Sequence, residues 1–445
     1  MNPKISLHFQ NRKPSVIRTA QIEFSKRRDE VEAVNVAIGN VSLPMHPAML
    51  RRLSDLRAEG GPFEHGAVRY TPTVGMETTR KAFANIIASS GFDSRRLFVQ
   101  VTDGGSQAME LVILGVCGGV GSGDRPLLIV DPTYTNYSSM ASRLGRGVVN
   151  LQRTLEEDGR FTLPDMSRID RIMRESGPGA LLVIPYDNPT GQLYTRDQML
   201  ELAELCVRHN LWMISDEAYR ELLYSEADTV SIWGVTDRDV PGIEGRRISI
   251  ESASKVWNAC GLRIGALITD NEEFHSRAVA ENTANLCPNA IGQHIFAALA
   301  EESHEELRHW YERQRGYYKS MLVELVSRMR QLLPDIIVSS PDASIYSVVD
   351  VRRIVPESFD AMDFVLYCAR EGAVQLHGTA RTLLVAPMSG FYDLPAKRNP
   401  GRTQMRIAYV ETPERMKWVP ELFAALLQAY LRHTGSAKAT VALQR

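Results

Sequence analysis

Four short polar motifs in the sequence carry the side chains that could do chemistry. They are Gly104-Gly105-Ser106-Gln107, Asn188-Pro189-Thr190-Gly191, Asp216-Glu217-Ala218-Tyr219 and Ser252-Ala253-Ser254-Lys255. With Arg263, eight residues beyond Lys255, they supply an amine, an acid, an amide, a phenol, a guanidinium and a glycine-rich helix start. Taken singly, each has a plainer explanation: a helix start, a turn, a helix N-cap with a packing tyrosine, or a solvated lysine.

The elements that must position these motifs are short apolar runs alternating with helical patterns, which is typical of βαβ units and a mostly parallel sheet. Candidate strands cover residues 97–102, 127–131, 181–185, 211–216, 247–252 and 264–269. Thr195 and Gln198 form a capping box at the start of a predicted helix. Because the carboxyl ends of parallel strands meet at one edge, where open sheets bind ligands, we expect the motifs to converge there. Their combined chemistry suits a phosphorylated pyridine aldehyde.

The pattern changes after residue 300, where a large α/β domain gives way to a smaller α+β domain. The expected elements are a charged helix over 301–333, a strand over 345–351, a terminal helix ending before Gly435, and a frayed tail over 436–445. Thr412 should cap the terminal helix, with Pro413 in its first turn. Pro420 should kink that helix.

Composition excludes several classes of protein. The 445 residues are 44% hydrophobic and 23% charged, which is ordinary for a globular chain with a large core. A net charge of −2 gives no support for a nucleic-acid partner or a polybasic membrane anchor. The five cysteines are scattered, so we expect reduced core thiols. No apolar run approaches the ~18 residues of a membrane span.

The N-terminal region carries Lys4, Arg12 and Lys13 but no apolar stretch, so no secretory signal is predicted. The first acidic residue is Glu23, which leaves an organelle transit peptide as an alternative. We therefore expect a cytoplasmic protein.

Two further patterns resemble known sites but lack their context. The glycine-rich run 118–123 precedes a candidate strand and has no Gly-Lys-Ser/Thr ending, so it predicts a flexible loop rather than a nucleotide site. His304 and His309 are five residues apart, and on a helix they would diverge. We therefore predict a solvated helix face there, and no metal site.

Six motifs in the chain match one protein family in their order. They are Tyr70-Thr71-Pro72-Thr73-Val74-Gly75, Asp131-Pro132-Thr133-Tyr134, the Asn188, Asp216 and Lys255 motifs, and Gly261-Leu262-Arg263-Ile264-Gly265. The chain resembles the class I/II aminotransferases, fold type I pyridoxal-phosphate enzymes of the aspartate aminotransferase superfamily, from Val34 to Tyr409. The resemblance implies a large pyridoxal-phosphate-binding α/β domain (48–315) with a central, mostly parallel seven-stranded sheet between helices. An N-terminal arm (1–47) would join a smaller C-terminal α+β domain (316–445).

The resemblance implies a chemical role for several side chains. Lys255 would form a Schiff base (an aldimine) with the cofactor aldehyde and would later move a proton between the substrate α-carbon and cofactor C4′. Asp216 would pair with the pyridine nitrogen and keep it protonated. Asn188 and Tyr219 resemble the family's partners of the cofactor 3′-oxygen, and Tyr134 resembles the ring stacked on the pyridine. Lys255, Asp216 and Tyr219 are therefore the catalytic candidates.

The same resemblance implies how the cofactor phosphate and the substrate are bound. The phosphate would be bound by the backbone of Gly105, Ser106 and Gln107 at a helix start, by the Ser252 hydroxyl and by Arg263. Tyr70 resembles the tyrosine that reaches the neighbouring subunit's phosphate, which implies a homodimer with shared sites; simple packing is the alternative. Arg406 matches the arginine that binds the substrate α-carboxylate, with a surface ion pair as the alternative. Gly39 and Asn188 would also contact substrate.

These features imply an aminotransferase that moves an amino group from an L-amino acid to a 2-oxo acid, commonly 2-oxoglutarate, by a ping-pong mechanism. A lyase, decarboxylase or oxidase of the same fold stays an alternative, because the motifs do not fix which substrate bond breaks. A cofactor-binding regulator of this fold would carry a basic DNA-binding domain before the family motifs. Only 33 residues precede Val34 and they show no helix-turn-helix, so the sequence does not favour a regulator. The Pro185-Tyr186-Asp187 run before Asn188 and the segment 392–402 depart from the family pattern, so substrate choice stays open.

Overall fold

The computed structural model describes residues 3–12, 14–339 and 342–435. The chain divides into two compact units: residues 40–323 with 339–346, and residues 1–39 with 324–338 and 347–445. These divisions fall at residues 39 and 323, each eight residues from the predicted domain boundaries at 47 and 315. The domain limits stay a prediction. The predicted frayed tail, 436–445, lies outside the described residues.

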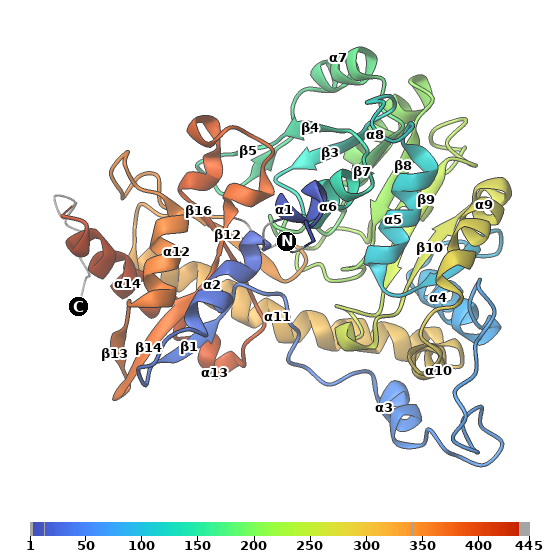
Figure 1. Cartoon of the computed structure of the whole chain (residues 1–445), viewed down its shortest axis with the longest axis horizontal. Helices are drawn as coiled ribbons and strands as arrows, with labels where there is room; N and C mark the ends of the chain where they lie inside the picture. The colour runs from blue at the N-terminus through green and yellow to red at the C-terminus, as the bar shows by residue number, and fades with distance from the viewer. Residues whose placement is uncertain (1–2, 13, 340–341, 436–445) are drawn as a thin grey trace. The chain divides into compact units, whose positions relative to one another are not determined.

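A seven-stranded sheet forms the centre of the first unit, in the order β2-β10-β9-β8-β7-β3-β4 (Figure 1). Its strands are β2 (Phe98–Thr102), β3 (Leu127–Asp131), β4 (Val148–Gln152), β7 (Ala180–Val183), β8 (Trp212–Asp216), β9 (Arg247–Ser252) and β10 (Gly265–Thr269). Neighbouring strands are parallel except that β10 runs antiparallel to both β9 and β2. The predicted mostly parallel sheet is confirmed, and each of the six candidate strands lies in it.

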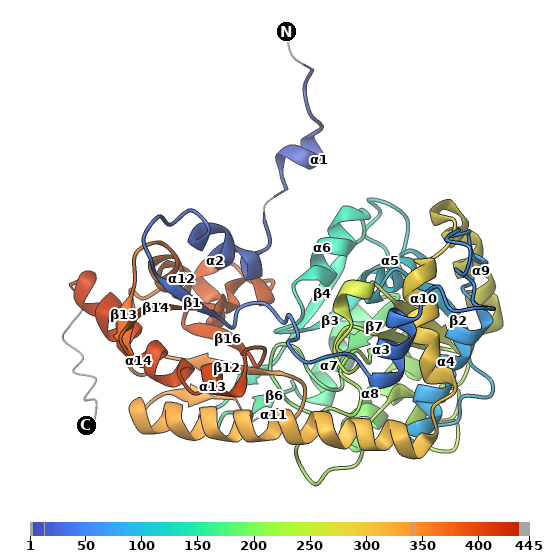
Figure 2. The same cartoon turned by 90° about the horizontal axis from the view of Figure 1, so that it is seen from below.

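Helices cover both faces of this sheet, with α5 and α6 on one face and α7 and α8 on the other (Figure 2). The helices of the unit include α3 (Pro47–Ser54), α4 (Glu77–Ser89), α5 (Gly105–Val116), α6 (Asn136–Arg143), α7 (Met166–Ser176), α8 (Arg196–Arg208), α9 (Glu272–Asn282) and α10 (Ala290–Phe296). Met109 of α5 and Met140 of α6 belong to the buried cluster that contains Leu127 and Ile129 of β3. This cluster makes the sheet face under α5 and α6 apolar. Polar groups that bind a ligand are therefore expected at the edge of the sheet. A short hairpin of β5 (Thr154–Leu155) and β6 (Phe161–Thr162) follows β4.

The second unit contains two small sheets, of order β1-β14-β13 and β11-β12-β16-β15. Their strands are β1 (Glu32–Asn35), β11 (Ile337–Val338), β12 (Tyr346–Asp350), β13 (Val374–Leu376), β14 (Thr379–Leu384), β15 (Ala386–Pro387) and β16 (Gln404–Ala408). The helices of the unit include α1 (Leu7–Gln10), α2 (Val16–Phe24), α12 (Ala361–Arg370), α13 (Pro413–Met416) and α14 (Val419–His433). The predicted α+β character is confirmed, and β1 joins this unit by pairing in parallel with β14.

The predicted terminal helix is divided into α13 and α14. Thr412 caps α13 by accepting a hydrogen bond from the Arg415 backbone N–H, as its position predicts. Pro420 lies in the first turn of α14. In a first turn the missing N–H of proline costs no helical hydrogen bond, so Pro420 begins a helix instead of bending one. In place of one kinked helix, the structure shows a helix interrupted at residues 417–418, just before Pro420.

α11 (His304–Leu332) is the long charged helix that the sequence predicts over 301–333. It contributes to both units, because the division falls between Val323 and Glu324. None of the helices within residues 3–12, 14–339 and 342–435 combines the length and the hydropathy needed to cross a membrane.

Candidate active site

The predicted motifs gather along one edge of the seven-stranded sheet. α5 begins at Gly105 shortly after β2, Asp216 ends β8, and Lys255 follows β9. Tyr134 and Asn188 follow β3 and β7 in the same way. Since β2 and β9 are each antiparallel to β10, they run in the same direction as each other. All five strand ends therefore lie at the carboxyl edge, where a doubly wound sheet binds its ligand.

Asp216 is held by two hydrogen bonds at this edge. The Tyr137 hydroxyl donates to Asp216 Oδ2, and the Ala218 N–H donates to Oδ1 at 3.0 Å. Burial raises the pKa of the Asp216 carboxyl, while the Tyr137 hydrogen bond and the nearby charge of Lys255 oppose the rise. Sequence reasoning missed Tyr137, although its position three residues after Tyr134, at the start of α6, puts the two rings close together. A cation next to this carboxylate would stabilise its charged form.

Asn188 and Tyr219, predicted to share one ligand atom, are brought together by the fold. Asn188 Nδ2 donates to the Tyr219 hydroxyl at 3.5 Å, and that hydroxyl lies 2.9 Å from the hydroxyl of Tyr346. All three side chains are buried. Tyr346 belongs to the first unit but lies 127 residues further along the chain than Tyr219. No local pattern could have found it.

A backbone cradle forms where β2 gives way to α5. A Cβ at Gly104 would lie 2.5 Å from Arg263 Nη2, and a Cβ at Gly265 would lie 2.5 Å from the Gly105 nitrogen. Gly104 also has a φ of 82°, which a glycine adopts without strain. Arg263 Nη2 donates to the Asp103 carbonyl at 3.4 Å, which places the guanidinium beside the first turn of α5. Two glycines thus let a cation and a helix N-terminus approach each other.

The remaining phosphate candidates, Ser106, Gln107 and Ser252, also lie beside this cradle. Ser106 and Gln107 are in the first turn of α5, whose N–H groups have no intrahelical acceptor. The Gln107 side chain accepts from the Asp103 N–H at 2.6 Å and donates to Asn282 at 3.2 Å, so it braces the turn. The Ser252 hydroxyl contacts the Ser254 hydroxyl at 2.7 Å. The group offers backbone donors, a hydroxyl and a positive charge to an anion.

Two aromatic candidates have different surroundings. The Tyr134 ring meets Tyr137 edge-on at 5.5 Å, and its hydroxyl accepts from Asn136 Nδ2 at 2.8 Å. Tyr70 is 81% exposed and lies in a run of exposed residues. The fold therefore fixes Tyr134 at the carboxyl edge and leaves Tyr70 on the surface of its own chain.

The last two predicted residues belong to the second unit. Arg406 in β16 is buried, and its Nη2 donates to the Ala37 carbonyl at 2.8 Å. Its guanidinium lies 5.0 Å from the centre of the Phe391 ring. Gly39 is two residues after Ala37, so the structure brings Arg406 and the Gly39 segment together. Burial and the contact with Ala37 argue against a surface ion pair for Arg406.

Comparison with known proteins identifies the family. The aminotransferase class I and II profile matches residues 32–391. The chain belongs to this family. It is 27% identical over 270 residues to the putative aminotransferase YugH of Bacillus subtilis, a match that spans 59% of this chain and 66% of that protein. It is 24% identical to kynurenine–oxoglutarate transaminase 3 of Rattus norvegicus, over 94% of this chain and 91% of that one. The fold is shared with N-succinyldiaminopimelate aminotransferase of Mycobacterium tuberculosis (TM-score 0.78, 22% identity, 95% and 100% coverage).

Aminotransferases of this family use pyridoxal phosphate, and the residues at the carboxyl edge fit that group. The glycines beside Arg263 suit its phosphate, since a Cβ at Gly104 would displace the Arg263 guanidinium and a Cβ at Gly265 would clash with the first turn of α5. The Asp216 carboxylate suits a protonated ring nitrogen, because a cation there would offset the burial that raises the pKa of Asp216. When bound, pyridoxal phosphate supplies an aldehyde and an electron-withdrawing ring.

A buried ionic cluster lies next to the site of this aminotransferase. Arg220 Nη2 donates to Glu251 Oε1 at 2.6 Å and lies 3.4 Å from Glu217 Oε2. Glu217 follows Asp216 directly, and its negative charge adds to the rise in the pKa of Asp216. Burial also raises the pKa of Glu251 to about 7, with Arg220 opposing the rise and Glu217 adding to it. Two carboxylates thus share one guanidinium out of reach of water.

This cluster predicts a pH dependence of stability. Between pH 4.5, the ordinary pKa of glutamate, and about 7, the folded state holds the Glu251 proton more tightly than the unfolded state. The free energy of unfolding should therefore fall as pH rises through this window, by up to about 1.4 kcal/mol per pH unit. Glu251→Gln should flatten this slope in urea unfolding, and Glu77→Gln on the exposed face of α4 should not. A Glu251→Gln variant with the wild-type slope would contradict the assignment.

The unfamiliar 392–402 segment packs on its own unit. Tyr392 is buried, and its hydroxyl donates to Gln404 Oε1 at 2.6 Å. Asn399 Nδ2 donates to the Ser389 carbonyl at 2.7 Å, and a Cβ at Gly401 would lie 2.4 Å from the Met388 carbonyl carbon. Tyr392, Asn399 and Gly401 thus anchor a segment whose middle, residues 395–398, is exposed to solvent.

Proposed function

We propose that this aminotransferase uses Lys255 as the residue that joins the cofactor aldehyde and moves the proton between the substrate α-carbon and C4′. Asp216 holds the proton on the ring nitrogen, and Tyr137 orients Asp216. Asn188 and Tyr219 donate to the ring oxygen, and Tyr134 covers one face of the ring. The observation that carries the proposal is the hydrogen-bonded Asp216 carboxylate at the end of β8, on the sheet edge where Lys255 follows β9.

The phosphate and the substrate carboxylate are assigned to separate groups. The first turn of α5 (Gly105, Ser106, Gln107) binds the phosphate with Ser252 and Arg263. Arg406, buried beside Ala37, binds the α-carboxylate through its planar fork, a task for which lysine is poorly suited. Gly39, two residues after Ala37, would contact the substrate beside Arg406. We infer that the donor is an L-amino acid and the acceptor a 2-oxo acid such as 2-oxoglutarate, which the name of the rat relative also contains.

Absorbance spectroscopy of the purified protein with added pyridoxal phosphate tests this function. We expect a visible band that one amino acid, added alone from a panel, converts to the near-ultraviolet band of the amine form of the cofactor. A 2-oxo acid should then restore the visible band. Release of ammonia in place of this cycle would favour the elimination or oxidation reaction of the same fold. A protein that acquires no visible band would overturn the assignment.

We also propose a homodimer with shared sites. The support is a set of exposed apolar side chains on the first unit, with Tyr70 81%, Val68 57% and Leu286 55% exposed. Thr73 Oγ1 donates to the Leu286 carbonyl at 2.8 Å, so two of these segments form one surface. Such a surface is suited to a second copy. Tyr70 would then reach the partner's phosphate. Light scattering that shows a monomer at micromolar concentration would contradict this arrangement.

A cytoplasmic location completes the proposal. All five cysteines are free thiols, and Cys206 and Cys368 are buried. Free thiols of this kind are typical of a reducing compartment.

A further inference from the structure

Three neighbouring strands, β4, β3 and β7, end beside one another at the carboxyl edge. Arg153 is the first residue after β4, and its backbone N–H donates to the Asp131 carbonyl at the end of β3, at 2.8 Å. Its side chain then turns inward, where it is 3% exposed.

One nitrogen of Arg153 joins the other two strand ends. Nη2 donates to the Pro132 carbonyl at 2.5 Å and lies 2.8 Å from Asp187 Oδ2. Pro132 is two residues before Tyr134, and Asp187 directly precedes Asn188. This one buried nitrogen therefore links the loop that carries Tyr134, proposed to cover the cofactor ring, to the turn that carries Asn188, proposed to donate to the ring oxygen.

The Asp187 turn is well fixed around this contact. Asp187 Oδ2 accepts from the Thr190 hydroxyl and, at 3.3 Å, from the Thr190 N–H. The Asp187 carbonyl accepts from the Gly191 N–H at 3.1 Å and from Ser344 Oγ at 2.8 Å. Rotation of the Asp187 side chain alone would break several of these contacts. A displacement of Arg153 should therefore be transmitted to Asn188.

We propose that the buried Arg153–Asp187 pair is a positioning element that sets the separation of Tyr134 and Asn188 across the cofactor ring. The inference rests on the proposed function, in which those two residues contact pyridoxal phosphate. It gives a reason for Asp187, which stands where the sequence departs from the family pattern. The pair is not itself a catalytic group.

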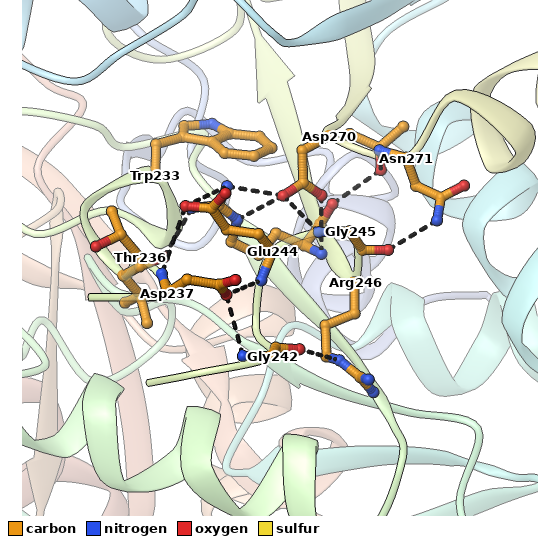
Figure 3. A network of polar contacts seen from close by, with 12 residues as sticks. Trp233, Thr236, Asp237, Gly242, Glu244, Gly245, Arg246, Asp270 and Asn271 are labelled. Atoms are coloured by element: carbon orange, nitrogen blue, oxygen red, sulfur yellow. Dashed lines mark hydrogen bonds and ion pairs between the residues drawn. The ribbon is translucent and has the colours of Figure 1, made fainter. Parts of the chain in front are cut away.

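The test compares this pair with a second buried arginine–aspartate pair of the same sheet. Arg247 Nε lies 2.7 Å from Asp270 Oδ2, and the two side chains are 9% and 7% exposed. Asp270 also accepts from the Gly245 N–H at 2.9 Å, within the network shown in Figure 3. Arg247 begins β9 and Asp270 follows the antiparallel β10, so this pair lies at the sheet edge opposite the site. It matches the first pair in type and burial but not in place.

The variants are Arg153→Met and Asp187→Asn, with Arg247→Met and Asp270→Asn as controls. All four should lower the thermal midpoint of the apoprotein, because each leaves a buried charge without its partner. Only the first two should weaken pyridoxal phosphate binding, by about 10- to 100-fold, the cost of small misplacements of binding groups. They should also shift the visible absorbance maximum of the bound cofactor. Arg153→Lys, which keeps a positive charge beside Asp187, should retain more of the affinity than Arg153→Met.

The double variant Arg153→Met/Asp187→Asn separates positioning from stability. Removing both charges should return the thermal midpoint of the apoprotein toward the wild-type value, while cofactor affinity stays low. Recovery of both quantities together would overturn the proposal, as would site variants whose cofactor affinity is within about twofold of the controls. Failure of the proposed function itself would look different, because then the wild-type protein would bind no cofactor.

Discussion

Replacing Lys255 by alanine should abolish the visible absorbance band that pyridoxal phosphate gives with the wild-type protein. It should also lower kcat by about 10²–10⁴-fold. Lys255 follows β9 at the carboxyl edge, close enough to Asp216 for its charge to lower the pKa of that carboxyl. Alanine has no amine to join the aldehyde or to carry the proton to C4′. Absorbance titration with cofactor and single-turnover kinetics with one amino acid measure the two losses separately.

Lys81→Ala provides the matched control for this experiment. Lys81 is on α4, where it is exposed and lies 2.7 Å from Glu77. An exposed ion pair of this kind contributes little to stability, so both the spectrum and kcat should stay at wild-type values. The far-ultraviolet circular dichroism of both variants should match the wild type. Wild-type turnover in the Lys255→Ala protein would disprove the assigned role.

Replacing Asp216 by asparagine should lower kcat/KM by about 10²–10³-fold, the range measured when one preorganised electrostatic partner of a reacting group is removed. Asparagine keeps the shape, and its Oδ1 can still accept from the Ala218 N–H while its Nδ2 donates to the Tyr137 hydroxyl. It has no charge, however, to hold a proton on the ring nitrogen. Steady-state kinetics with the best amino acid from the panel measure this effect.

Tyr137→Phe should give a graded version of the same loss, of roughly tenfold, because it removes only the hydrogen bond to Oδ2. The pKa of Asp216 should then rise further, since that hydrogen bond opposes the rise caused by burial. The acid limb of the kcat/KM profile should therefore move to higher pH in this variant. A Tyr137→Phe loss larger than that of Asp216→Asn would show that Tyr137 acts on something other than the carboxylate.

Much of the fold could be predicted because its signals are local. The buried strands are short segments between helical patterns, and β3 and β9 have the bounds that the sequence predicts for them. The capping box at Thr195 and Gln198 likewise forms within four residues of chain. Pro420 predicts a disturbance of the terminal helix, and the structure interrupts that helix at residues 417–418, but the sequence does not show whether the helix bends or divides there.

The polar partners behind the site could not be predicted, since they join segments that are far apart in the chain. Tyr346 meets Tyr219 across 127 residues, and Arg153 meets Asp187 only because β4 and β7 flank the same strand. A buried charge is recognisable only once its partner is in place, so neither Arg153 nor Asp187 differs in sequence from a surface residue. The predicted contact residues, by contrast, belong to contiguous motifs.

The antiparallel strand β10 has a consequence for how the site assembles during folding. Because β10 returns directly beside β9, Lys255 and Arg263 are only eight residues apart in the chain and lie within one hairpin. Closing so short a loop costs little chain entropy, whereas Asp216 and Asn188 must wait for parallel crossovers that enclose whole helices. The amine assigned to the cofactor aldehyde and the guanidinium assigned to its phosphate should therefore come together early, as one local unit, before the sheet around them is complete.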